Sequence, residues 1–199
     1  MGLRSHAGKP LRDHIAKVAA LLYYSDGVQR VGMDRIAAEA GVTKRTLYRH
    51  FPSKEALVAG ALRLAPRVHF PRLGSPIERI LGAFAVAEEF LTDTQFRGCP
   101  YIIFAAELTD RRHPARTLIE ELLAKRRRWF RERAAEAGAP EPDRLAEQLD
   151  VIFDGAVASG AKRGDLRPVR AAMEAAKLVL VHTLEQAGVR RPALTLHAS

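Results

Sequence analysis

Residues 33–51 read MDRIAAEAGVTKRTLYRHF, and this stretch decides the fold. Its first part carries apolar side chains at the spacing of one helical face, and Gly41 then offers a backbone suited to a sharp turn. Thr43 is a good N-cap for a second short helix, in which Leu47 and Phe51 fall on the inner side. The pattern therefore predicts a helix-turn-helix, whose second helix enters the major groove of DNA.

The outer side of the second helix is dense in hydrogen-bond donors. The leading turn of such a helix penetrates deepest into the groove, so Lys44 and Arg45 are the best candidates to donate to guanine O6 and N7. The alternative is that this basic face is merely solvated. The predicted DNA-binding residues are Thr43, Lys44, Arg45, Thr46, Tyr48, Arg49, His50 and Lys54.

The run GVTKRTLYRHFPSKEAL, residues 41–57, closely resembles the DNA-binding segment of the TetR family of bacterial transcriptional regulators. The shared pattern is TLYxHF followed by xSKExL, at the family's usual distance from the N-terminus. The resemblance implies that Tyr48 and His50, with Lys54 beside them, contact phosphates. Such contacts position a protein on the duplex and do not read its sequence. The rest of the chain matches the family in layout only.

The start of the first of these two helices departs from the family pattern. The family usually places there a Thr whose hydroxyl caps the helix and can donate to a phosphate, whereas this chain has Gly32 and Met33. Gly tolerates the cap position, and the free N–H groups of a helix start still attract a phosphate. Asp34 suits the helix dipole but would repel a phosphate lying close to it. Contacts between this helix and DNA therefore stay open.

Length and charge agree with a DNA-binding protein. A chain of 199 residues can bury one sizeable core, or a small head and a larger body. Its 32 Lys and Arg exceed its 23 Asp and Glu, for a net charge of +9. Residues 1–54 hold 10 of these basic residues and 4 of the acidic ones, so most of the excess lies on the predicted DNA-binding segment. An anionic partner is indicated.

Several classes of protein are disfavoured by the sequence. The single cysteine excludes an intramolecular disulfide framework and fits a reducing cytosol. Since there is no signal-peptide run and no apolar stretch of membrane-spanning length, we expect a cytoplasmic protein without a membrane partner. The chain contains no Gly-rich phosphate loop, HExxH, GxSxG or CxxC motif, so we predict no enzyme and no cofactor. Asp150 and Asp154 lack a His or Cys at ligand spacing, and we predict no metal site.

Helical periodicity continues through the rest of the chain, which predicts an all-α protein. We expect an N-terminal three-helix DNA-binding head over 1–54 and a C-terminal helical bundle over 55–199, with the helix after Ser53 as connector. In the first helix, Leu11, Ile15, Val18 and Leu22 are expected to form a stripe on one face, with Ala19 and Ala20 beside it. Segment 101–109 is apolar almost all round and should be buried. Helices are expected at about 10–25, 76–91, 101–109, 114–138, 142–161 and 168–187.

The C-terminal bundle should hold a ligand pocket, because cavities between bundle helices suit small amphipathic molecules. Ordinary core packing is the alternative for every lining candidate. The candidates are Phe84, Glu88, Cys99, Tyr101, Phe104, His113, Trp129 and Phe153.

The resemblance implies that the last two helices pair with their copies in a second subunit as a four-helix interface. A two-fold dimer is also what a palindromic operator requires. Small side chains on these helices would let them approach closely. The predicted interface residues are Ala156, Ser159, Gly160, Ala172, Ala175, Ala176, Val179, Leu180 and Thr183.

The densest basic run, KRRRWFRER over 125–133, allows two interpretations. It is either a solvated outer surface or a second surface for nucleic acid or an acidic partner. For the whole chain we expect a TetR-like repressor that binds a palindromic double-stranded DNA operator as a homodimer and is released by a small amphipathic or hydrophobic ligand. The alternative is a ligand-independent regulator whose C-terminal body only dimerises or contacts protein.

Overall fold

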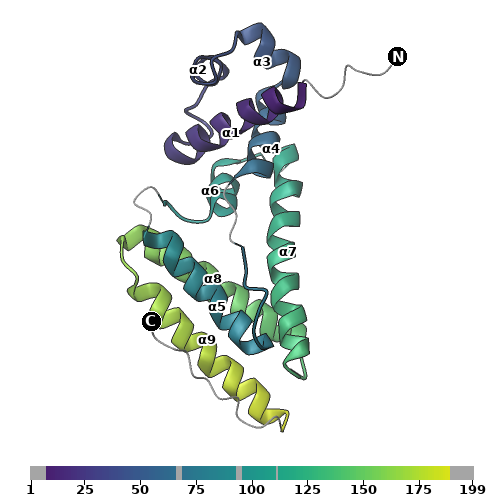
Figure 1. Ribbon diagram of the computed structural model, residues 1–199, viewed down its shortest axis with the longest axis vertical. Coiled ribbons are helices and arrows are strands. Elements are labelled where there is room, and N and C mark those ends of the chain that lie inside the picture. The colour runs from purple at the N-terminus through teal and green to yellow at the C-terminus, as the bar shows by residue number, and fades with distance from the viewer. Residues whose placement is uncertain (1–7, 66–68, 93–95, 111, 189–199) are drawn as a thin grey trace, which may run out of the picture. The chain divides into compact units, whose positions relative to one another are not determined.

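The computed structural model describes residues 8–65, 69–92, 96–110 and 112–188 of the chain (Figure 1). These residues form helices and no strand, which confirms the predicted all-α class. Most helix boundaries agree with the periodicity to within two residues. The helices are α1 (Gly8–Asp26), α2 (Met33–Glu39), α3 (Lys44–His50), α4 (Lys54–Leu64), α5 (Pro76–Thr92), α6 (Pro100–Glu107), α7 (Pro114–Glu136), α8 (Pro142–Arg163) and α9 (Arg167–Gln186).

The chain divides into two compact units, each described here by itself. The first consists of residues 1–67 together with 100–122, and the second of residues 68–99 together with 123–199. The first unit is larger than the head expected over 1–54, because it also contains α4, α6 and the beginning of α7.

In the first unit, α1 packs against α2, α4 and α6. Its buried face consists of Ile15, Ala16, Ala19, Ala20 and Tyr23, whereas Leu11, Val18 and Leu22 of the expected stripe are half-buried. Ile15, Ala19 and Ala20 of the predicted face are thus buried, and its other three residues lie at the margin of the contact. The reason is steric: alanine side chains allow a close approach of neighbouring helices, and the larger aliphatic side chains lie at the margin of the contact.

The prediction that α6 is buried all round was wrong. Phe104 is fully buried and meets Tyr23 edge-on, with 6.1 Å between ring centroids, but Ala106 is exposed and Tyr101 is half-buried. A helix of only 8 residues at the side of the first unit contacts its neighbours through one face. Burial raises the pKa of the Tyr23 hydroxyl well above its usual value, so this side chain stays neutral.

The core of the second unit lies between α5, α8, α9 and the second part of α7. Three fully or almost fully buried rings, Phe84, Phe130 and Phe153, meet at its centre. Phe70, from the non-helical segment before α5, stacks on Trp129 with 4.6 Å between centroids and also contacts Phe130 and Phe153. The aromatic side chains of this unit thus pack mainly against one another.

Helices α8 and α9 lie side by side over most of their length (Figure 1). The turn between them begins at Gly164, whose φ of +65° is a left-handed conformation that favours glycine and whose N–H donates to Gly160 O at 2.8 Å. Among the described residues, no helix is both long enough and apolar enough to cross a lipid bilayer.

Candidate nucleic-acid interface

The turn between α2 and α3 is fixed by local hydrogen bonds. Gly41 adopts a φ of +64°, and its N–H donates to Ala38 O at 3.1 Å, while Val42 N–H donates to Ala37 O at 2.9 Å. These two bonds form the Schellman motif that ends a helix in a left-handed residue. His14 Nε2 also lies 3.1 Å from Ala40 O, which ties α1 to the turn. The sequence prediction of a helix-turn-helix is confirmed in this geometry.

Helix α3 begins and ends on side chains that the sequence identifies. Thr43 caps its N-terminus, because the Thr43 hydroxyl accepts a hydrogen bond from Thr46 N–H at 3.1 Å. Leu47 and Phe51 are completely buried and hold the helix on the first unit. The Phe51 ring is covered by the Arg12 guanidinium, which lies 4.5 Å from its centroid.

The opposite side of α3 faces solvent. Lys44, Arg45, Tyr48 and Arg49 are exposed, and Thr46 and His50 are half-buried. Tyr48 keeps 40% of its surface exposed, which is unusual for a large aromatic side chain in this structure. The structure therefore presents four predicted DNA-binding residues on one accessible surface above a buried apolar base.

Lys44 has a partner that the sequence analysis did not assign to it. Its Nζ lies 2.7 Å from Asp34 Oδ1, so the first residue of α3 is ion-paired with the first turn of α2. The hydrogen bond to Asp34 raises the pKa of Lys44, and the lysine stays charged. A phosphate that bound this ammonium group would compete with the carboxylate of Asp34.

The two remaining phosphate-contact candidates, His50 and Lys54, are half-buried in the first unit. His50 Nε2 is enclosed and has no hydrogen-bond partner in the described part of the chain, so Nδ1 is the ring nitrogen available for a phosphate. Lys54 Nζ donates to Gln29 O at 3.4 Å, which leaves its other N–H groups free to reach DNA.

Glu107, at the end of α6, is a residue of this region that the sequence analysis missed. Its carboxylate accepts hydrogen bonds from Val28 N–H at 2.5 Å and from Gln29 N–H at 3.3 Å. The Gln29 side-chain amide also donates a hydrogen bond to the backbone oxygen of Glu107, at 3.2 Å. The loop between α1 and α2 is thereby held by a residue 78 positions further along the chain, and no local pattern could have indicated this contact.

The N-terminus of α2 has no side-chain cap. Gly32 occupies the N-cap position with φ −87° and ψ 162°, an extended conformation that any residue can adopt, and a β-carbon there would meet nothing within 4 Å. The backbone N–H groups of this helix start remain accessible to an anion, but Asp34 lies in the same turn.

The structure divides the eight ligand-pocket candidates between the two units. Tyr101, Phe104 and His113 belong to the first unit, and Phe84, Glu88, Cys99, Trp129 and Phe153 belong to the second. Phe84, Phe104 and Phe153 are buried in their cores, which corresponds to the alternative of ordinary packing. Glu88 pairs with Arg170 at 2.7 Å, and His113 Nδ1 accepts from Ala115 N–H at 3.1 Å.

A groove of about 480 Å³ lies on α8, α9 and the turn before α8, and none of the eight candidates lines it. Leu178 and His182 form part of its wall, together with two of the predicted interface residues, Val179 and Thr183.

Four of the nine predicted interface residues are buried within the second unit itself. These four pack inward within the single chain, and their contact with a second copy stays a prediction. Gly160 shows the reason, because a β-carbon there would lie 2.6 Å from Leu91 Cδ1 and the glycine serves the close approach of α5. The inward-facing four are Ala156, Gly160, Ala176 and Leu180. The half-buried five are Ser159, Ala172, Ala175, Val179 and Thr183.

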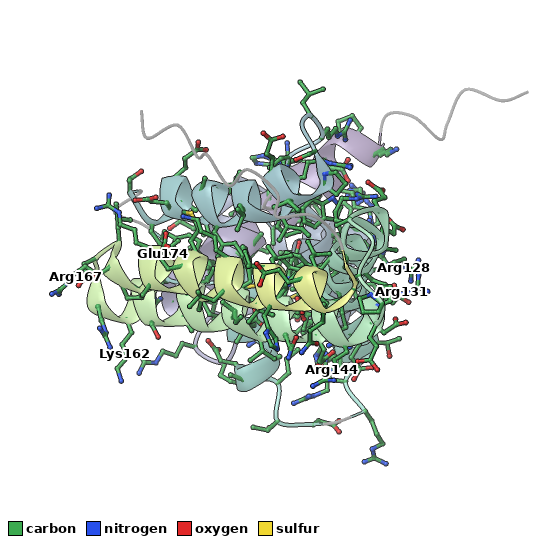
Figure 2. The ribbon with its side chains drawn as sticks, turned by 90° about the horizontal axis from the view of Figure 1, so that it is seen from below. Arg128, Arg131, Arg144, Lys162, Arg167 and Glu174 are labelled. Atoms are coloured by element: carbon green, nitrogen blue, oxygen red, sulfur yellow. The ribbon has the colours of Figure 1, made fainter. Side chains whose placement is uncertain are left out.

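Most of the basic run over 125–133 is neutralised by acidic residues of α8 or by its own helix. Arg126 lies 2.6 Å from Asp150 and 2.8 Å from Asp154, and it is 9% exposed. Its neighbour Arg127 pairs with Glu147 at 3.0 Å. The structure therefore favours a structural role for this run over a second nucleic-acid surface. Figure 2 shows Arg128 and Arg131 pointing outward from α7, and Arg131 pairs with Asp143 at 2.7 Å.

Comparison with known proteins places this interface in a family. Residues 15–61 match the family model of bacterial regulatory proteins of the tetR family. A TetR-class protein of Streptomyces avermitilis is 34% identical, aligns with 83% of this chain and 97% of its own, and has a TM-score of 0.73. A TetR transcriptional regulator of Chloroflexus aurantiacus shares the fold, with 23% identity, 92% and 98% coverage and a TM-score of 0.74.

Two further relatives carry information on DNA or on other roles. The TetR-family regulator CifR, solved with a 26-bp double-strand operator, has the same fold at 18% identity, 84% and 94% coverage and a TM-score of 0.61. The nucleoid occlusion factor SlmA of Shewanella sediminis is 39% identical over 51 residues, which are 26% of each chain. The match thus spans about a quarter of that relative's length.

Proposed function

Because the chain belongs to the tetR family of bacterial regulatory proteins and is a DNA-binding transcriptional regulator, we propose that it binds a palindromic operator as a homodimer. The observation that carries the proposal is the accessible side of α3, capped by Thr43 and seated on buried Leu47. The protein acts in the cytoplasm, where bacterial DNA lies, and it is not an enzyme.

We assign different roles to the residues of α3. Arg45 is exposed in the leading turn, where a guanidinium can donate two hydrogen bonds to guanine O6 and N7. Tyr48 and Lys54 contact phosphates and set the position of the helix on the duplex. The half-buried His50 contributes a phosphate contact through Nδ1.

Pairing of two copies is supported by the outer faces of α8 and α9. Val151 and Leu178 are 64% and 72% exposed, although both are large and apolar. Small exposed residues, Ala158 on α8 and Ala171 on α9, lie at helical spacing beside them. A face of this kind loses its contact with water when it packs on a second copy, and two-fold pairing presents two α3 helices to successive major grooves.

We further propose that the protein is a repressor and that a small amphipathic or hydrophobic ligand releases it from DNA. An effector that entered the aromatic core of the second unit would have to displace rings, and Phe70 is the ring most easily moved, because it comes from a non-helical segment and is half-buried. The packing of Phe84 against Phe153, and of Trp129 against Phe70 and Phe130, favours the second candidate, a regulator that responds to no ligand.

One measurement separates these two candidates. Trp129 is the single tryptophan in the sequence and stacks on Phe70, so its fluorescence reports on this packing. A ligand that releases the operator should change the emission of Trp129 and raise the melting temperature of the free protein. If no compound in a broad screen changes the emission of Trp129 or raises the melting temperature, the ligand-independent regulator is favoured.

The first prediction concerns Arg45. DNA fragments retained by the purified protein are sequenced to give the operator, and binding of Arg45→Ala to operator and to random DNA is then compared. We expect a loss of about 1–3 kcal/mol on the operator alone, because a bidentate contact to guanine discriminates by that amount. Tyr48→Phe is the comparison, since loss of a phosphate contact should weaken both DNAs alike.

An equal loss on both DNAs for Arg45→Ala would contradict base reading by this residue. Absence of any preferred fragment would contradict the proposed function itself. A promoter-reporter strain that carries the operator then shows whether the bound protein lowers transcription, as a repressor should, or raises it.

A further inference from the structure

The ion pair between Lys44 and Asp34 joins the two helices of the helix-turn-helix at their N-terminal ends. Lys44 is the first residue of α3, and Asp34 lies in the first turn of α2. The two side chains are 60% and 74% exposed and their charged atoms are 2.7 Å apart. In the described part of the chain, neither Arg45 nor Arg49 forms an ion pair.

The basic residues of α3 therefore differ in how strongly they attract a phosphate. Non-specific binding to DNA is almost entirely an attraction between cations and phosphates, and each cation that neutralises a phosphate releases counterions. Lys44 carries its charge beside a carboxylate, so its net attraction to a phosphate is reduced. Arg45 retains its full charge and its planar set of donors for a base edge.

We propose that Asp34 is a specificity-determining residue that acts through Lys44. By pairing with this charged lysine, Asp34 lowers the affinity for random DNA more than the affinity for the operator, and so widens the ratio between the two. The inference rests on the proposed function, because it requires an operator that α3 reads. A simpler role, direct repulsion of a phosphate by Asp34, would not involve Lys44.

The test is Asp34→Asn, which removes the charge and keeps the shape of the side chain. Affinities for the selected operator and for random duplex of the same length are measured over a range of salt concentrations. On random DNA we expect an increase of about three- to tenfold at low salt and a salt slope steeper by about 0.9, the change for one added phosphate contact. On the operator we expect a smaller increase, so the specificity ratio falls.

Asp34→Asn combined with Lys44→Met tests whether Asp34 acts through Lys44. If Asp34 acts through Lys44, then Asp34→Asn should change neither affinity nor salt slope once the lysine is gone. The double-mutant cycle isolates the coupling of the two side chains. An undiminished gain in the Lys44→Met protein would overturn the proposal, because it would show direct repulsion of DNA by Asp34.

A matched control exists in the second unit. Asp143 lies in the first turn of α8 and pairs with Arg131, which Figure 2 shows at the surface of α7. This pair has the same 2.7 Å separation, and its side chains are 79% and 52% exposed. Asp143→Asn changes the net charge by the same amount and should leave the specificity ratio unaltered. An equal fall of the ratio in both variants would overturn the proposal in favour of net charge alone.

The result also separates the inference from the function on which it rests. Preference of the unmodified protein for its operator, with a specificity ratio that Asp34→Asn leaves unchanged, would overturn the role of Asp34 only. Binding of the unmodified protein to all fragments alike would overturn both. Asp34 is exposed, so the variant is expected to fold, and circular dichroism checks this before the DNA measurements.

Discussion

Gly60 allows α4 to pack closely against Phe51, the buried residue that follows α3. A β-carbon at this position in α4 would lie 2.6 Å from Phe51 Cε1, and Phe51 is fully buried beneath Arg12. We predict that Gly60→Ala destabilises the first unit by about 1–3 kcal/mol, the usual cost of overpacking a well-filled core. Urea unfolding followed by circular dichroism measures the change.

Gly155 provides the control for this prediction. It lies within α8, where a β-carbon would meet nothing within 4 Å. Gly155→Ala should therefore stabilise the protein by about 0.5–1 kcal/mol, because glycine is the poorer helix former. A Gly60→Ala protein as stable as Gly155→Ala would show that Phe51 moves aside without cost.

At the scale of the helix, α7 carries two adjacent arginines in different environments. Arg126 is 9% exposed and is the partner of Asp150, itself 7% exposed, whereas Arg127 is 50% exposed. We predict that Arg126→Met destabilises the protein by about 3–5 kcal/mol, because Asp154 loses this arginine and the buried Asp150 keeps only the longer contact with Arg127, at 3.5 Å. The exposed pair of Arg127 with Glu147 should contribute only about 0–1 kcal/mol.

Arg126→Met and Arg127→Met are compared by urea unfolding at one protein concentration, so that any pairing of subunits affects both equally. They remove the same charge from the same helix, and only burial differs. Equal losses of stability would contradict the structural role of Arg126 and would favour the interpretation of the basic run as a solvated outer surface.

At the scale of the whole molecule, the proposed homodimer depends on the outer faces of α8 and α9. We predict that Leu178→Asp shifts the protein toward the monomer, because an unpaired carboxylate would be buried where an exposed leucine meets its copy. Sedimentation velocity measures the shift, and affinity for the palindromic operator should fall with it.

Leu73→Asp is the matched control, since Leu73 is 89% exposed and lies in the non-helical segment before α5. This variant should keep the mass and the operator affinity of the unmodified protein. A dimer that survives Leu178→Asp would place the subunit contact on another face of the molecule.

The sequence alone determined the class of the fold, most of the helices and the helix-turn-helix. These features follow from interactions between residues at most five positions apart, such as the Thr43 cap on Thr46 and the bonds that close the turn at Gly41. The accessible residues of α3 were also predictable, because buried Leu47 and Phe51 fix which side of this short helix faces inward.

The tertiary structure alone decided which contacts form between distant parts of the chain. It centred the buried face of α1 on the alanines beside the expected stripe, packed Phe84 and Phe153 into a core, and brought Glu107 to the loop at Val28. It also paired Lys44 with Asp34, so a predicted base-reading residue is partly neutralised. Periodicity gives the spacing of side chains along one helix, but the neighbour that each side chain meets depends on how other helices pack against it.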